Sequence, residues 1–96
     1  MFEKLEELAK NNKKISDFHL RSGSVLAYRQ TGEIIMVKEV PVKPQDLIDL
    51  MTTNCNEIET KKFQDTHELD SSVTISGLRF RANFYKTLNG PSALLR

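Results

Sequence analysis

The chain has 96 residues, of which 39% are hydrophobic and 28% are charged, as expected for one small globular domain. Its 14 basic and 13 acidic side chains leave a net charge of +1. This balance argues against nucleic-acid binding and membrane-surface binding, because each needs a basic excess gathered on one face. No apolar run approaches the roughly 20 residues of a membrane span, so we expect a cytoplasmic protein without direct membrane insertion.

The first third of the chain predicts a helix and three strands. Four apolar residues at helical spacing predict a helix from residue 2 to about residue 12: Phe2, Leu5, Leu8 and Ala9. The alternation of apolar and polar residues over 15–20 predicts a half-buried strand. Thr31-Gly32 lies between two strand-like runs, 25–30 and 33–37, and therefore predicts a β-hairpin.

Two further helices are predicted in the middle of the chain. Pro44 suits the first turn of a helix, where its missing N–H costs nothing, and Leu47, Leu50 and Met51 give that helix an apolar side. Asn56 is followed three residues later by Glu59, a spacing typical of a capping box, which predicts a second helix. Between them lies Cys55, the only cysteine, which cannot form an internal disulfide. With no histidine near it in sequence, we expect an inert thiol.

The last third predicts three antiparallel strands joined by tight turns at Ser76-Gly77 and Asn89-Gly90. The first turn places Val73 opposite Phe80. The second places Phe84 opposite Leu95 and Asn83 opposite Arg96. One face then collects the apolar residues Leu69, Val73, Ile75, Leu78, Phe80, Phe84 and Leu95. We expect one α+β domain over 1–96, with a mostly antiparallel sheet of about six strands covered on one side by about three helices.

The same register gathers three arginines on the opposite face. Arg79 and Arg81 are two residues apart on one strand, with Cβ atoms about 7 Å from each other, and Arg96 is expected diagonally across from Arg81. Two interpretations remain open. The face is either a solvated surface with ion pairs, in which Asp70 neutralises Arg81, or an anion site in which planar guanidinium groups bind phosphate oxygens.

The chain contains no phosphate-binding loop of its own. The pattern G-x-x-x-x-G-K-[ST] does not occur, and no acidic residue ends an apolar strand in the Walker B manner. We therefore expect no enzymatic activity from this chain, and the arginines could act only on a nucleotide held by another domain. Asp17 and His19 share a strand face and could be combined with His67 as metal ligands, but ligand spacing is missing. We expect no metal site, and a histidine bonded to backbone or to Asp17.

Five segments in order resemble the N-terminal domain of the pilus-retraction (PilT) ATPases of twitching motility, within the type II/IV secretion ATPase superfamily. They are Ser16-Asp17-Phe18-His19-Leu20, Tyr28-Arg29-x-x-Gly32-Glu33, Glu68-Leu69-Asp70, Arg79-Phe80-Arg81-Ala82-Asn83-Phe84 and Gly90-x-x-Ala93-x-x-Arg96. The resemblance runs from about Leu5 to Arg96. Asp17, His19 and Asp70 belong to its structural motifs.

The resemblance implies a PAS-like domain joined to a RecA-like motor domain that this chain lacks. It also implies a homohexamer at the cytoplasmic face of the bacterial inner membrane, working with the pilus machinery, with ATP and Mg²⁺ bound between the two domains. By motif, Arg79, Arg81 and Arg96 are the candidates to approach the nucleotide phosphates.

The sequence departs from the family pattern at three places: the hairpin Arg29-Gln30-Thr31-Gly32, Ser71 after the acidic motif, and the turn Leu88-Asn89-Gly90-Pro91. These departures leave open a related pilus-assembly or type II secretion ATPase. A free-standing PAS-like sensor or adaptor is the alternative from another class. It would need an internal pocket, yet the chain has no tryptophan and only 7% aromatic residues to line one.

Overall fold

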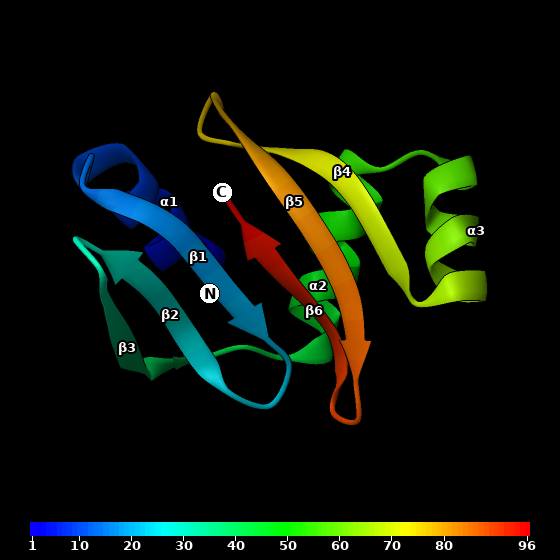
Figure 1. Ribbon diagram of the computed structural model, residues 1–96, viewed down its shortest axis with the longest axis horizontal. Helices are drawn as coiled ribbons and strands as arrows, with labels where there is room; N and C mark the ends of the chain where they lie inside the picture. The colour runs from blue at the N-terminus through cyan, green and yellow to red at the C-terminus, as the bar shows by residue number, and fades with distance from the viewer.

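The computed structural model describes all 96 residues and contains one sheet with helices packed against it (Figure 1). The elements in chain order are α1 (Phe2–Asn11), β1 (Ile15–Arg21), β2 (Val25–Gln30), β3 (Glu33–Pro41), α2 (Pro44–Asn54), α3 (Glu57–Thr66), β4 (Glu68–Ile75), β5 (Leu78–Thr87) and β6 (Gly90–Leu95). All five strand pairings are antiparallel. The predicted α+β class, with six strands and three helices, is confirmed. No helix is both long enough and apolar enough to cross a membrane.

The sheet has the strand order β3-β2-β1-β6-β5-β4, so the last strand of the chain lies in the middle. β6 pairs with β1 on one side and with β5 on the other. The two hairpins that flank it therefore come from opposite ends of the chain, as Figure 1 shows by colour.

The helices begin at the residues that the sequence predicts. Pro44 occupies the first turn of α2, and the Asp46 carboxylate accepts a hydrogen bond of 2.9 Å from the Lys43 N–H. The Asn56 side chain accepts from the Glu59 N–H at 2.8 Å, and the Glu59 carboxylate accepts from the Asn56 N–H at 3.2 Å. This reciprocal pair is the predicted capping box, which satisfies two of the free N–H groups at the start of α3.

The core lies between the helices and one face of the sheet. Phe18 on β1, Phe84 on β5 and Leu95 on β6 are fully buried there together with Leu5 of α1 and Leu47 of α2. In Figure 1, α1 and α2 lie behind the sheet, while α3 lies beside β4. No helix covers the other face, which we call the open face.

The register of β4 and β5 follows the prediction. Ser76 and Gly77 form the turn with φ angles of 51° and 78°, and Val73 pairs with Phe80. Such turns need positive φ at both central residues. Thr31 and Gly32 form the β2–β3 turn in the same way, with φ angles of 47° and 82°.

The β5–β6 turn lies one residue earlier than predicted, which shifts the register of β6 against β5 by two residues. Leu88 and Asn89 form the loop, and Gly90 pairs with Thr87 as the first residue of β6. Phe84 therefore pairs with Ala93 rather than Leu95, and Asn83 pairs with Leu94 rather than Arg96. Because the side-chain period of a strand is two, a shift of two residues leaves every side chain on its expected face.

Long-range packing explains the shifted turn. Gly90 has a φ of 125°, and a Cβ there would lie 3.3 Å from both the Pro44 side chain and the Ser22 hydroxyl. A Cβ on Gly23 would likewise lie 3.3 Å from the Asn89 side chain, so Asn89 also packs closely against a glycine. The Thr87 hydroxyl accepts from the Asn89 N–H at 3.2 Å and donates to the Gly90 carbonyl at 3.1 Å. Gly90 is thus needed both for its positive φ and for this close packing.

We predict that Gly90→Ala destabilises the fold more than Gly32→Ala does. Both glycines have positive φ, a conformation that costs an L-residue about 1–2 kcal/mol, but a Cβ on Gly32 meets nothing within 4 Å. Gly90→Ala should therefore lower the free energy of unfolding by roughly 1–3 kcal/mol beyond the matched variant, because of the contact with Pro44 and Ser22. Urea unfolding of the two variants measures the difference. Equal losses would show that the turn is not held by this packing.

Candidate anion site on the open face

Arg81 and Arg96 lie directly opposite each other on β5 and β6. The Arg81 N–H donates to the Arg96 carbonyl at 3.0 Å, and the Arg96 N–H donates to the Arg81 carbonyl at 2.8 Å. Directly opposed residues point to the same side of a sheet, so both side chains project from the open face. The pairing is therefore closer than the diagonal one that the sequence predicts.

Arg79 shares this face but its side chain turns toward β4. Its Nη2 donates to the Ser72 hydroxyl at 3.3 Å, and Ser72 lies opposite Arg81 on the neighbouring strand. Of the three predicted arginines, Arg81 and Arg96 are therefore direct neighbours, and Arg79 lies beside them with its guanidinium on Ser72.

Arg81 and Arg96 line a hollow of about 220 Å³ on the sheet surface. Its other lining residues are Asp70, Ser71, Ala82, Asn83 and Leu94. Two guanidinium groups on neighbouring strands repel each other unless an anion lies between them. A phosphate group fits this arrangement, since each guanidinium can donate two parallel hydrogen bonds to its oxygens.

The nearest acids do not neutralise the two arginines. No carboxylate lies within 4.0 Å of the Arg79, Arg81 or Arg96 guanidinium group. Asp70 instead accepts a hydrogen bond of 2.9 Å from the Asn83 amide, its direct partner across β4 and β5. The ion pair between Asp70 and Arg81, which the solvated-surface interpretation expects, is absent.

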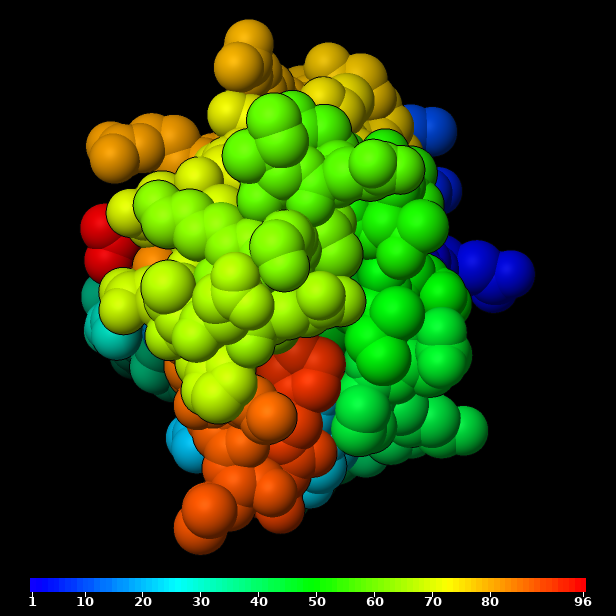
Figure 2. All heavy atoms as spheres, turned by 90° about the vertical axis from the view of Figure 1, so that its right-hand side faces the viewer, coloured from blue at the N-terminus to red at the C-terminus, as the bar shows by residue number.

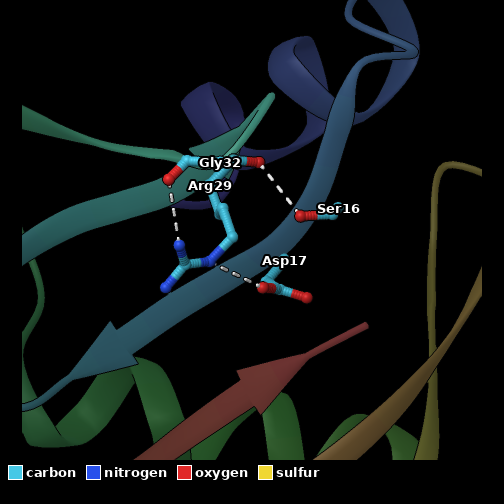
Figure 3. A network of polar contacts seen from close by, with 4 residues as sticks. All are labelled: Ser16, Asp17, Arg29 and Gly32. Atoms are coloured by element: carbon cyan, nitrogen blue, oxygen red, sulfur yellow. Dashed lines mark hydrogen bonds and ion pairs between the residues drawn. The ribbon is translucent and has the colours of Figure 1, made fainter.

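Asp17 is held by Arg29 on the neighbouring strand β2 (Figure 3). The Arg29 Nε lies 3.3 Å from the Asp17 carboxylate, and the Arg29 Nη1 donates to the Gly32 carbonyl at 3.2 Å. The Ser16 hydroxyl donates to the Arg29 carbonyl at 3.5 Å. Arg29 therefore joins β1 to the tip of the β2–β3 hairpin.

His19 does not form the expected hydrogen bond. It lies on the open face of β1 between Ala27 and Leu94, and its Nε2 is buried without a partner. His67 has a different position, at the C-terminal end of α3 with a φ of 61°. No three histidine, cysteine, aspartate or glutamate residues gather where they could hold a metal ion.

The largest hollow, about 380 Å³, lies between α2, α3 and the β5–β6 hairpin. It is lined by Ile48, Met51, Thr52, Thr60, Phe63, Gln64, His67, Lys86 and Pro91. Figure 2 shows it at the surface, below α3 and beside α2. Leu47 of α2 and Phe84 of β5 are fully buried in the core and do not line it.

Comparison with known proteins gives matches among solved structures. No protein-family model and no curated protein matches the sequence significantly. The crystal structure of the pilus retraction motor PilT with bound ADP matches with a TM-score of 0.79 and 28% sequence identity, over 100% of this chain and 28% of that one. The Legionella pneumophila ATPase DotB matches with a TM-score of 0.75 and 15% identity, over 99% of this chain and 28% of that one.

The fold is that of the N-terminal region of PilT-like ATPases. The resemblance that the sequence predicts is confirmed as a structural match over the whole chain. The chain spans 28% of the length of each of the two ATPases, and the match does not extend to their catalytic part.

One polar cluster, formed by Cys55, Glu59 and Ser71, was not predicted from the sequence. The Ser71 hydroxyl donates to the Glu59 carboxylate at 2.7 Å, and the Cys55 thiol donates to the Ser71 hydroxyl at 3.6 Å. Burial raises the pKa of the Cys55 thiol, which outweighs the lowering by its hydrogen bond to Ser71. A raised pKa leaves the thiol protonated at neutral pH, so Cys55 lacks the thiolate that a nucleophile needs.

We predict that Ser71→Ala raises the pKa of Glu59 toward its ordinary value. The Ser71 hydroxyl is the main cause of the lowered pKa of this carboxyl group, followed by the hydrogen bond with the Asn56 backbone. A lowered folded-state pKa adds stability at pH values above the unfolded pKa, and this stability is lost as the pH falls through the folded pKa. The variant should therefore lose less stability on acidification. NMR titration of the Glu59 carboxyl carbon measures the shift, and an unchanged pKa would contradict the assignment.

Proposed function

We propose that this chain is the N-terminal domain of a hexameric type IV pilus-retraction ATPase, and that its arginines contact ATP held by a separate RecA-like motor domain. The match to PilT over the whole chain, at 28% identity, carries the proposal. The PilT structure contains ADP, so a nucleotide is the natural anion for the hollow beside Arg81 and Arg96.

The chemistry of the hollow agrees with a phosphate ligand. A guanidinium group binds phosphate oxygens through a planar fork of donors, and neither the Arg81 nor the Arg96 guanidinium is neutralised by a carboxylate in this chain. In phosphoryl transfer, guanidinium groups stabilise the charge that develops on the phosphate oxygens, and a correctly placed arginine can accelerate the reaction by about 10³–10⁵. Arg79 supports the positive potential of the site from its place beside Ser72.

The nucleotide itself must be bound elsewhere. The chain has no phosphate-binding loop, and three arginines without one lack most of the phosphate cradle. No group of three acidic or histidine side chains could hold Mg²⁺ here, so its ligands would come from the motor domain and the nucleotide. The domain would act by contacting the motor domain and neighbouring subunits of a homohexamer, at the cytoplasmic face of the inner membrane beside the pilus machinery.

The match to DotB supports a second candidate within the same superfamily. Its TM-score of 0.75 is close to that of PilT, and at 15% identity it shows a shared fold. A domain of this fold could therefore serve a pilus-assembly or secretion ATPase with the same arginine contacts.

We predict that Arg81→Ala and Arg96→Ala in the full-length motor each lower the rate of ATP hydrolysis by roughly tenfold or more, because each removes a phosphate contact. Arg79→Ala should have a smaller effect, since its guanidinium already binds Ser72. Arg21→Ala is the matched control, because Arg21 is an exposed arginine of the open face that lies opposite Ser92 rather than in the hollow. Steady-state hydrolysis at saturating and limiting ATP measures the effects. Wild-type rates for both Arg81→Ala and Arg96→Ala would discard the role.

A further inference from the structure

We propose that Arg29 is a positioning residue that keeps Asp17 from neutralising Arg96. The inference rests on the proposed function, because it concerns the availability of Arg96 for a phosphate group. It explains why an acidic side chain can lie next to the candidate anion site without occupying it.

The strand registers place Asp17 between two arginines. On one side it pairs with Arg29 of β2. On the other side β1 pairs with β6, with Phe18 opposite Leu95, and continuing this register by one residue places Asp17 beside Arg96. Neighbouring residues in such a row lie about 5 Å apart, within reach of a carboxylate and a guanidinium group.

The Asp17 carboxylate forms an ion pair with only one of these two arginines. It lies 3.3 Å from the Arg29 Nε, whereas no carboxylate lies within 4.0 Å of the Arg96 guanidinium. Figure 3 shows the Asp17 and Arg29 side chains turned toward each other, with the end of β6 on the far side of Asp17.

The second contact of Arg29 fixes its direction. Its Nη1 donates to the Gly32 carbonyl at the hairpin tip, so the guanidinium is held at both ends. The Asp17 side chain is only 21% exposed, which weakens the screening of its charge by water. Without Arg29, this partly buried carboxylate would have Arg96 as the cation on the neighbouring strand and would compete with a phosphate group for it.

The test compares four variants of the full-length motor with Arg96→Ala. Arg29→Ala should lower ATP hydrolysis about as much as Arg96→Ala does, by roughly tenfold. Arg29→Ala combined with Asp17→Asn should restore most of the rate, because the competing charge is gone. Arg29→Lys, which keeps the positive charge beside Asp17, and Asp17→Asn alone should each retain most of the wild-type rate.

The rescue separates this role from a purely structural one. Asp17→Asn cannot repair a hairpin weakened by the loss of Arg29, so an equally low rate in the double variant would overturn the proposal. A wild-type rate for Arg29→Ala would also overturn it, provided that Arg96→Ala is slow.

A structural readout tests the inference independently of the proposed function. In a crystal structure of the Arg29→Ala motor, the Asp17 carboxylate should lie within hydrogen-bonding distance of the Arg96 guanidinium group. If Arg96→Ala hydrolyses ATP at the wild-type rate, the proposed function fails, while this contact would still decide whether Arg29 separates the two charges. A carboxylate that stays away from Arg96 would overturn the inference in either case.

Discussion

The insertion of β6 between β1 and β5 is the constraint on which the rest of the structure depends. Leu95 pairs with Phe18 on one side and with Ala82 on the other, and all three are buried beneath the helices. This row joins the β1–β2–β3 half of the sheet to the β4–β5 half. Without it each half would keep an unpaired edge and half of a core, and the two-stranded β4–β5 hairpin would be at best marginally stable alone.

The same pairing decides the charge pattern of the open face. Each strand alternates between the core and the open face, so fixing Leu95 inward also fixes Arg96 outward, next to Arg81. The arginines of this face are Arg21, Arg29, Arg79, Arg81 and Arg96, and its acids are Asp17, Glu68 and Asp70. Two of these acids bind other partners, Arg29 and Asn83, which leaves a local excess of positive charge in a chain whose net charge is only +1.

Short-range patterns were sufficient to predict most of the fold. The alternation in β4 and β5 and the Ser76-Gly77 turn predicted the pairing of Val73 with Phe80, because both signals lie within a few residues of each other. The β5–β6 turn could not be predicted in this way. Its position depends on Gly90 packing against Pro44 and Ser22, which are distant in the sequence.

The candidate site shows the same division between local and long-range information. The strand face of the arginines followed from the alternation of residues, and Arg81 and Arg96 were correctly placed on one side. Asp17 binds Arg29, and Asp70 binds Asn83. Each acid has several possible neighbours, and the spacing of residues in the sequence does not predict which one it binds.

The pairing of β6 also bears on how the chain folds. The Ser22 N–H donates to the Ser92 hydroxyl across 70 positions of sequence. The entropy of closing so long a loop must be overcome before β6 is paired, so a nascent chain would complete this sheet only after its last strand has left the ribosome.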